Sequence, residues 1–386
     1  MHGKEIINFL VGTLGLKVDE KDKNGEEPIH YAIRAKNISF AQELLKRRHP
    51  KGAEESKNNL LHFCVMDNKL ELAKIMLEED RNLLNEPGEL GLKTIHLAAW
   101  NSDLEMFKWL VDEVVDVYEL CSNYKASALH YAAYNKSHGK KLIRYLISDL
   151  GFDVHAKAEN GLTPLHYALY NENVNNATLL LNLGADIEVR EDDSDNSDDL
   201  LSYCARSKKS ESVKFLLKHH PEFIKEIDAN GFSAFQFIVQ FADWELVKWI
   251  LDEFKTEIAG VAEGLHFATY NISHGKELVR HFVSEMNLDV NAAEENRGWT
   301  PLHYAFFAEN VEIAEELVKL GADLEVELHS NNLLHFCVVM NKLKSAKYLL
   351  VNKLLPINEP NKNGKTAVHL AAEHASVEML KLLTKG

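Results

Sequence analysis

Histidine is the residue type in this sequence with the widest capacity for chemistry, because an imidazole can bind a metal ion or transfer a proton near neutral pH. The chain has 19 histidines. Metal-binding histidines are usually grouped at short spacings, as in His-Glu-x-x-His, or paired with Cys-x-x-Cys, and neither pattern occurs. His219 and His220 are adjacent, so on a helix they would point in different directions and make a poor ligand pair. The histidines therefore predict no metal site.

Two other segments have part of a known catalytic or nucleotide-binding motif. Residues 363–366, Asn-Gly-Lys-Thr, are similar to the end of a phosphate-binding loop, but Glu359 stands where that loop needs a glycine. Ser202 lacks the flanking glycines of the G-x-S-x-G motif of serine hydrolases. We therefore expect no catalytic residue, no cofactor and no enzymatic activity.

About half of the histidines return at one position of a six-residue motif, which is clearest as Thr-Pro-Leu-His-Tyr-Ala at 163–168 and 300–305. This position occurs eleven times, at intervals of 30 to 37 residues. Nine copies keep the histidine, and Ser202 and Gln236 replace it in the other two. The eleven positions are 30, 62, 96, 130, 166, 202, 236, 266, 303, 335 and 369. Such regular spacing indicates a repeated structural unit.

Each copy of the motif has the features of a helix start. Thr163 can cap a helix with its hydroxyl, and Pro164 suits the first helical position because it has no N–H to leave unpaired. A second helix is predicted from the apolar positions between Val174 and Leu181, with Gly184 able to end it in the left-handed conformation. Such a pair of short helices cannot bury its apolar face alone and must stack on its neighbours.

A motif of this form with a period of about 33 residues resembles the ankyrin-repeat family, and the resemblance covers nearly the whole chain. It implies an all-α solenoid of stacked helix-turn-helix units joined by β-turn fingers. Residues 158–161 look like the tip of one such finger. The resemblance also implies that the motif histidine is structural, with its imidazole bonded to finger backbone so that adjacent loops are tied together.

A longer period of 136 residues lies over the repeats. Residues 137–140, Ser-His-Gly-Lys, recur at 273–276, and the segment 58–64 recurs at 331–337. We therefore expect a single ankyrin-repeat array over residues 1–386. It would contain about eleven units, arranged as a block of four repeats copied nearly three times.

Both ends of the sequence fall within a repeat. Residues 1–16 align with the second helix of a unit, and residues 383–386 stop where a further Gly-Ala-Asp turn would fall. Terminal units of a solenoid usually have a polar capping face, whereas Ile6, Ile7 and Leu10 give the first segment the character of an interior helix. We therefore expect a segment of a longer array. A natural chain closed by half-repeat caps is the alternative.

An acidic insertion interrupts the regular spacing at residues 188–199, where seven acids accompany one base. Such a run of charge predicts a solvated loop at a finger position. The spacing of its acids has some similarity to a calcium-binding loop, but the required glycine and the final glutamate are missing. The acidic-loop residues are Asp192, Asp193, Asp195, Asp198 and Asp199.

Composition limits the class of partner and the compartment. The formal net charge is −16, and 46% of the residues are hydrophobic. Nucleic-acid binding needs a basic stripe, so the charge favours a protein or peptide partner of basic character, unless the acidity serves only solubility. The sequence contains no apolar run long enough to cross a bilayer and no signal-peptide pattern. Cys64, Cys204 and Cys337 occupy the small buried position of the motif, which indicates packing in a reducing, cytoplasmic or other intracellular compartment.

The candidate binding residues lie four and five positions after the motif histidine. In the ankyrin-repeat family these positions are near the end of the first helix, face the concave groove and vary with the partner. Large rigid side chains there would anchor an interface, unless duplication only copied a ring that covers the next repeat. The predicted partner-binding residues are Trp100, Asn101, Tyr134, Asn135, Tyr170, Asn171, Tyr270, Asn271 and Phe307.

The sequence therefore predicts a non-catalytic scaffold that binds a protein or extended peptide on its concave face. The alternative is the substrate-recognition arm of a larger protein whose active domain lies outside residues 1–386. Such a protein would be a ubiquitin-ligase receptor, a toxin or an effector delivered into a host cell. An ankyrin fold does not by itself identify the partner, and the oligomeric state is left open.

Overall fold

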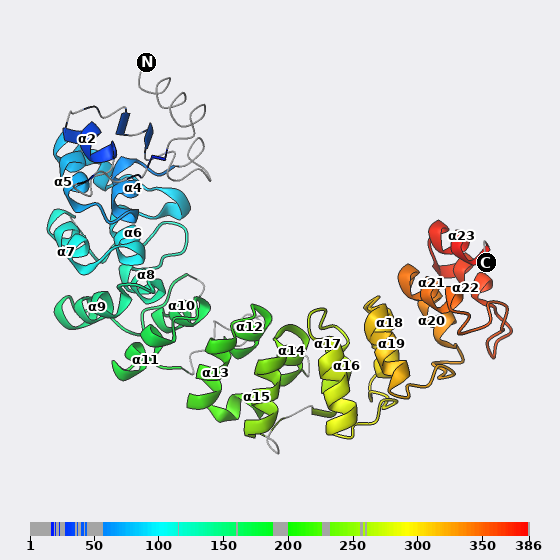
Figure 1. Ribbon diagram of the computed structural model, residues 1–386. Coiled ribbons are helices and arrows are strands. Elements are labelled where there is room, and N and C mark those ends of the chain that lie inside the picture. Colours follow the sequence, from blue (N-terminus) through cyan, green and yellow to red (C-terminus); the bar gives the residue numbers. More distant parts are fainter. Residues whose placement is uncertain are drawn as a thin grey trace. The chain divides into compact units, whose positions relative to one another are not determined.

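The structure, a computed structural model, describes residues 57–114, 116–159, 161–187, 200–225, 232–254, 258 and 261–384, together with parts of the segment before residue 57, chiefly 28–34 (Figure 1). The chain divides into two compact units, Met1–Ser197 and Asp198–Gly386. The boundary falls in the acidic insertion, and all of residues 188–199, including the five aspartates, lie outside the described residues. That the array continues across this boundary, and that it belongs to a longer one, both stay predictions.

The first unit consists of pairs of short helices, each pair being one repeat. The first helix of a pair carries the motif, and it packs against the first helix of the next repeat. The first helices are α2 (Pro28–Arg34), α4 (Leu60–Met66), α6 (Thr94–Asn101), α8 (Ala128–Tyr134) and α10 (Pro164–Tyr170). The described second helices are α5 (Leu70–Glu79), α7 (Leu104–Glu113), α9 (Gly139–Arg144) and α11 (Val174–Asn182), and short turns η2 (Arg81–Leu84), η3 (Glu89–Gly91) and η4 (Tyr145–Asp149) follow some of them.

The second unit repeats this arrangement. Its first helices are α12 (Leu200–Arg206), α14 (Ala234–Phe241), α16 (Val261–Ala268), α18 (Pro301–Phe307), α20 (Leu333–Val339) and α22 (Ala367–His374). Its second helices are α13 (Ser210–His219), α15 (Trp244–Phe254), α17 (Gly275–Arg280), α19 (Val311–Lys319), α21 (Leu343–Val351) and α23 (Val377–Thr384), with the short turns η5 (Pro221–Lys225) and η6 (His281–Glu285). The part of the chain that the structure describes contains no β-strand, only an isolated bridge between Leu328 and Asn331. The predicted all-α class is confirmed.

The predicted helix starts are confirmed, and the motif side chain has a larger part in them than expected. Helix α10 begins at Pro164, with Thr163 extended before it (φ −94, ψ 169). The backbone N–H of Thr163 donates to Nδ1 of His166 at 3.2 Å, and the Thr163 hydroxyl lies 2.7 Å from the same nitrogen. At α4 the bonding is reciprocal, because Asn59 Oδ1 also accepts the His62 N–H at 3.0 Å. The imidazole therefore helps to fix the first turn of its own helix.

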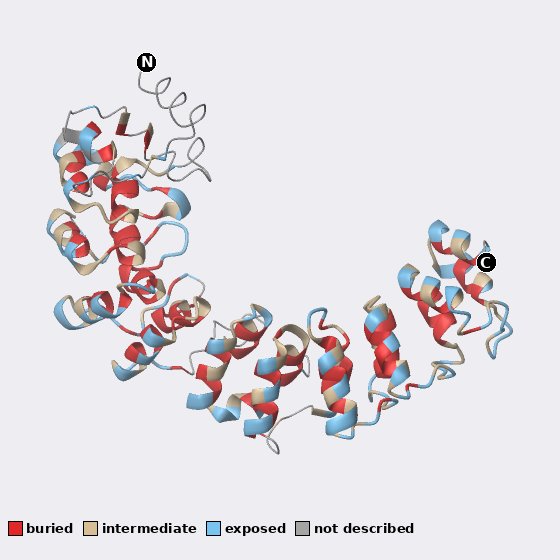
Figure 2. Ribbon diagram, viewed as in Figure 1, coloured by how far each residue is buried: buried red, intermediate tan, exposed pale blue. Residues whose placement is uncertain are grey.

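The core lies between the stacked helices. Figure 2 shows first helices such as α6 and α8 buried over most of their length, whereas second helices such as α15 and α19 have buried and exposed residues on different sides. In repeats four and five, Leu129, Leu165, Ala132 and Ala168 are all completely buried. The small side chains let neighbouring first helices approach closely, and each buried leucine contributes about 1.5–3 kcal/mol relative to an exposed one.

Two of the three longest repeats contain a π-helical turn. Helices α9 and α17 continue into η4 and η6, which are π-helical. Both helices start with a glycine that lies very close to the preceding first helix. A Cβ on Gly139 would lie 2.6 Å from the Ala132 carbonyl oxygen, and one on Gly275 would lie 2.8 Å from that of Ala268. The Ser-His-Gly-Lys segment therefore needs its glycine for helix packing.

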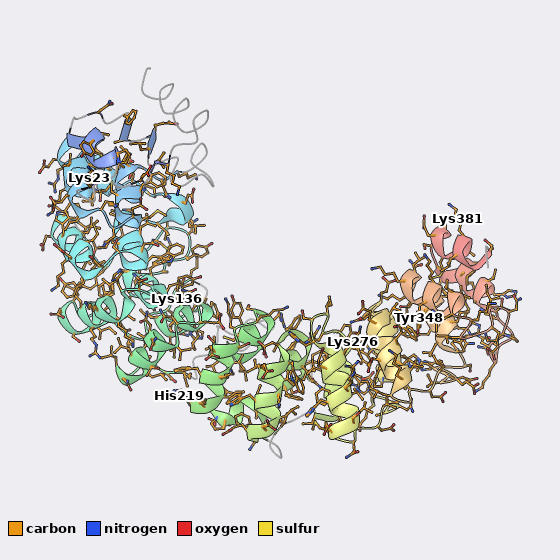
Figure 3. The ribbon with its side chains drawn as sticks, viewed as in Figure 1. Lys23, Lys136, His219, Lys276, Tyr348 and Lys381 are labelled. Carbon is orange, nitrogen blue, oxygen red and sulfur yellow. The ribbon has the colours of Figure 1, made fainter. Side chains whose placement is uncertain are left out.

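Ion pairs join second helices of neighbouring repeats at the surface. Lys276, labelled in Figure 3, donates to Glu312 at 2.6 Å, so it connects α17 with α19. The Arg280 guanidinium donates to Glu316 at 2.5 Å between the same two helices. The Lys276–Glu312 pair is open to solvent and adds little to stability, whereas Glu316 of the second pair is buried.

Candidate partner-binding face

The five aromatic residues singled out from the sequence lie at the ends of first helices. Trp100 is the penultimate residue of α6, and Tyr134, Tyr170 and Phe307 are the last residues of α8, α10 and α18. Tyr270 follows α16 by two residues. All five side chains are partly exposed. We call Trp100, Tyr134 and Tyr170, which belong to three consecutive repeats of the first unit, the aromatic face.

Ring contacts between repeats hold the aromatic face in place. The ring centroids of Trp100 and Tyr134 lie 5.6 Å apart with the planes at 83°. Trp100 also stacks on Tyr131 at 5.9 Å and 28°. Tyr131 is 6% exposed and meets Tyr167 of the next repeat at 5.9 Å. The rings therefore contribute to packing between repeats, as expected if duplication copied a ring that covers the next repeat. Part of their surface is nevertheless open to solvent.

The corresponding rings of the second unit also contact neighbouring side chains. Tyr270 meets Tyr304 of the next repeat at 5.8 Å, edge to face. Phe307 lies 5.1 Å from the ring of Trp299, and Nζ of Lys342 lies 3.9 Å from its centroid. A lysine therefore covers one face of Phe307.

The sequence analysis placed Asn135 and Asn271 among the residues available to a partner. This expectation needs correction, because both residues are only 3% exposed. Asn135 donates from Nδ2 to the carbonyls of Ala99 at 3.1 Å and Ser102 at 3.2 Å, at the end of helix α6 of the preceding repeat. Its Oδ1 accepts the N–H groups of Ser137 and His138.

Asn271 makes the same set of bonds, with Val239 and Ala242 as its acceptors, both at 2.9 Å. Each of these two asparagines satisfies carbonyls that a helix end leaves unpaired. Their bonding capacity serves the stacking of repeats.

Asn101 and Asn171 are partly exposed but also bonded within the fold. Asn101 donates to the Leu97 carbonyl of its own helix at 3.2 Å. Asn171 donates to the Tyr134 carbonyl of the preceding repeat at 2.7 Å. Three asparagines that the sequence analysis missed act in the same way on preceding helices: Asn173, Asn176 and Asn310.

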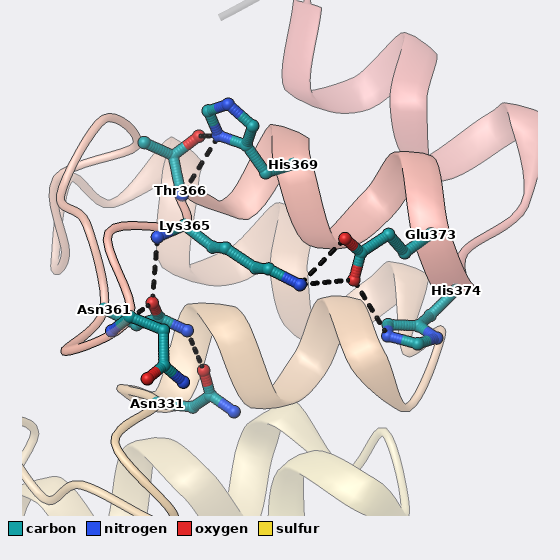
Figure 4. A network of polar contacts seen from close by, with 8 residues as sticks. Asn331, Asn361, Lys365, Thr366, His369, Glu373 and His374 are labelled. Atoms are coloured by element: carbon teal, nitrogen blue, oxygen red, sulfur yellow. Dashed lines mark hydrogen bonds and ion pairs between the residues drawn. The ribbon is translucent and has the colours of Figure 1, made fainter.

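The motif histidines have the structural function implied by the resemblance. Because Nδ1 of His96 accepts the Lys93 N–H at 3.1 Å, its proton must be on Nε2, which lies 2.9 Å from the Glu119 carbonyl oxygen. His130 reaches the Leu162 carbonyl at 3.1 Å in the same way, and His266 reaches that of Ala292 at 3.0 Å. Each acceptor belongs to the finger of the next repeat. Figure 4 shows the helix-capping half of this pattern in the last repeat, where Thr366 donates to His369.

Burial keeps these imidazoles neutral. It lowers the pKa of His62, His130 and His303 to about 4. At His96 and His130 both ring nitrogens meet backbone groups, whereas Nε2 of His303 has no hydrogen-bond partner among the described residues. A buried imidazole with so low a pKa is a poor general base at neutral pH. Burial also raises the pKa of the Cys64 thiol to about 12, so this cysteine is unreactive packing material.

Among the described residues, no group of three His, Cys, Asp or Glu side chains is placed to hold a metal ion. None of the described helices has the length and apolar character needed to span a membrane. The four cysteines are all buried and form no disulfide bond.

Family models match most of the chain. A model described as ankyrin repeats (3 copies) matches residues 1–86, 95–191, 237–327 and 265–354. A second, described as ankyrin repeats (many copies), matches residues 334–384.

Curated proteins with similar sequences come from several sources. A putative ankyrin repeat protein of fowlpox virus is 29% identical over 167 residues, which cover 42% of this chain and 32% of that protein. The human ankyrin repeat and SOCS box protein 6 is 27% identical over 197 residues, covering 49% of this chain and 46% of that protein. The human transient receptor potential cation channel subfamily A member 1 is 24% identical over 423 residues, covering 95% of this chain and 37% of the channel. The chain thus spans between a third and a half of the length of these relatives.

Proposed function

Because the chain belongs to the ankyrin-repeat family, whose repeats generally mediate protein–protein interaction, we propose that it is a non-catalytic scaffold that binds a protein or an extended peptide. The binding surface is the face where the first helices end. The observation that carries the proposal is the partial exposure of Trp100, Tyr134 and Tyr170 in three consecutive repeats.

The packing of the aromatic face supports this function. Contacts with Tyr131 and with each other hold Trp100 and Tyr134 in fixed positions before any partner arrives. A pre-ordered anchor loses little side-chain entropy on binding, so more of the contact energy remains as affinity. Tyrosine and tryptophan are also the side chains most enriched among the residues that dominate interface energies.

The asparagines beside the rings have a separate function in the proposal. The side chains of Asn135 and Asn271 are buried and hydrogen-bonded within the fold, so they position the neighbouring rings and do not touch the partner. Asn101 and Asn171 lie partly exposed at the edge of the aromatic face, where their remaining bonding capacity is directed at the partner's backbone.

The charge of the chain supports a partner of basic character. With a net charge of −16, long-range attraction speeds the encounter with a positively charged segment and repels nucleic acid. The acidic insertion at 188–199 adds to this field. The buried cysteines, which form no disulfide bond, support a reducing, intracellular compartment.

The proposal is tested by affinity capture from lysate, followed by mass spectrometry, with the full chain as bait. Trp100→Ala is compared with Trp109→Ala, a matched change on helix α7 of the same repeat. We expect Trp100→Ala to lose the captured partners, while Trp109→Ala keeps them. Equal capture by the two variants, with both folded by circular dichroism, would exclude the aromatic face as the binding surface.

A second candidate function is the recognition arm of a larger protein. The observation that favours it is the length of the relatives, of which this chain matches only 32%, 46% and 37%. The name of one of them combines ankyrin repeats with a SOCS box, and that of another denotes a cation channel. A putative ankyrin repeat protein of Rickettsia felis, 20% identical over 93% of this chain, is consistent with delivery into a host cell. Sequencing the transcript beyond residues 1 and 386 tests this: an additional domain supports the arm, and flanking stop signals exclude it.

A further inference from the structure

One aromatic residue of the candidate set already has a cation on its ring. Lys342 is the residue immediately before helix α21, and its Nζ lies 3.9 Å from the centroid of Phe307 in the preceding repeat. At this distance the ring quadrupole attracts an ammonium group. We call the residue immediately before a second helix the cap position.

The cap position lies against the end of the preceding first helix in other repeats as well. Asn173, before α11, donates to the carbonyls of Ala133 and Asn135, which flank Tyr134. Asn310, before α19, donates to the Thr269 carbonyl beside Tyr270. The fold therefore brings the cap residue of one repeat to the aromatic residue of the repeat before it.

In the first unit the cap positions that follow Trp100 and Tyr134 are His138 and Asn173 instead of lysine. Among the described residues, no lysine or arginine lies over the ring of Trp100 or Tyr134. Both rings are partly exposed. Their open surface is therefore available to a cation that the chain itself does not supply.

The electrostatic surroundings favour such a cation. Asp103, the cap residue of the repeat that carries Trp100, interacts electrostatically with His138 of the next repeat. The whole chain also carries a net charge of −16. An approaching ammonium or guanidinium group would meet a negative field and two ring faces.

We propose that Trp100 and Tyr134 bind a lysine or arginine side chain of the partner, and that Lys342 on Phe307 is an internal version of this contact. The inference rests on the proposed function and adds to it the chemistry of the bound segment. It also explains a difference between the units. In the second unit Lys342 already occupies the ring of Phe307.

The test uses the full chain and two fluorescein-labelled Gly-Ser peptides, compared by fluorescence anisotropy at physiological salt. One peptide contains arginine and lysine at intervals, and in the other citrulline and glutamine replace them. We expect the cationic peptide to bind more tightly. Trp100→Leu and Tyr134→Leu should each weaken its binding about 2- to 30-fold, the range for cation–π contacts. The matched control Trp109→Leu should leave it unchanged.

A gain-of-charge variant separates the cation from the ring. In His138→Lys an ammonium stands at the cap position of the repeat after Trp100, the position that Lys342 has in the repeat after Phe307, and no ring is removed. We expect it to weaken binding of the cationic peptide at least as much as Trp100→Leu. As its control, Lys136→Arg in the same turn keeps the charge and should have no effect.

The outcomes distinguish this inference from the proposed function. If the two peptides bind equally, or if charge-dependent binding survives both leucine variants, the cation inference is wrong. Absence of binding by the cationic peptide overturns it as well. Capture of a natural partner that still depends on Trp100 would then keep the proposed function, whereas capture that ignores Trp100 would remove both.

Discussion

The Nε2 atom of His130 donates a hydrogen bond to the carbonyl oxygen of Leu162, 3.1 Å away in the finger of the next repeat. Its Nδ1 accepts the Ser127 N–H at 3.2 Å, so one imidazole joins a helix start to a neighbouring loop. Repeats of this kind touch only their neighbours, and such links carry the cooperativity of the array.

The first prediction is that His130 stabilises the fold. His130→Ala would leave the buried Ser127 N–H unpaired and would remove one of the two donors to the Leu162 carbonyl, the other being the Ala158 N–H, at a cost of about 1–3 kcal/mol. His369→Ala is the matched control, because that imidazole is exposed. Chemical denaturation should show a clearly larger loss for His130→Ala. Equal losses would mean that the bond to the finger adds nothing.

The second prediction concerns pH. Burial lowers the folded-state pKa of His62, His130 and His303 to about 4. The unfolded value is about 6.5, so protonation favours the unfolded chain. Stability should be constant above about pH 6.5 and fall as the pH is lowered toward 4, each histidine contributing at most about 1.4 kcal/mol per pH unit.

Melting temperatures measured between pH 7.5 and 5 test this prediction. His130→Gln is the informative variant, because glutamine can still accept the capping N–H but does not titrate. Gln236 does this naturally, with its Oε1 2.9 Å from the Ser233 nitrogen. The variant should have a shallower dependence on pH. A melting temperature that is flat over the whole range would refute the assignment of buried neutral histidines.

The third prediction separates the asparagines. Asn135→Ala should destabilise the chain by about 1–3 kcal/mol, because it leaves the Ala99 and Ser102 carbonyls unpaired at the end of α6. Asn101→Ala, which removes a single bond on a partly exposed surface, should cost less. Thermal melts of the two variants measure the two losses of stability, and the loss for Asn135→Ala should be the larger. If Asn135→Ala leaves the melting temperature unchanged, Asn135 becomes a candidate binding residue again.

The fourth prediction is that the second unit opens more easily near its start. Ser202 replaces the motif imidazole in α12, and Gln236 in α14 keeps the capping bonds with Ser233. Amide hydrogens of α12 and α14 should therefore exchange faster than those of α8 and α10. Equal protection of the two pairs of helices, measured by mass spectrometry, would show that these substitutions are compensated.

The sequence predicted the helix starts and the structural histidines because these depend on local contacts. Thr163, Pro164 and His166 are adjacent in sequence, so their capping geometry follows from the motif. The function of Asn135 depends on carbonyls 33 and 36 residues away, and only the fold brings them together. A signal was nevertheless present, since an asparagine followed two residues later by serine is typical of an Asx turn.

The exposure of the rings could not be predicted from the sequence for the same reason. Tyr131 and Tyr134 are three residues apart in α8, yet one is buried and the other is partly exposed. The difference is set by Trp100 and Tyr167 in the adjacent repeats. Likewise, nothing in the sequence pattern predicted the π-helical turn at 145–149.

The central claim, that the aromatic face binds the partner, is tested most directly by the double variant Tyr134→Ala with Tyr170→Ala. Its affinity for a captured partner and its melting temperature should be measured on the same preparation. Loss of an anchor of this type costs about 2 kcal/mol or more, or about thirtyfold in affinity. We predict at least this loss, with the circular dichroism spectrum and the melting temperature nearly unchanged. Unchanged affinity, or a melting temperature lowered by many degrees, would contradict the account and make these rings packing residues.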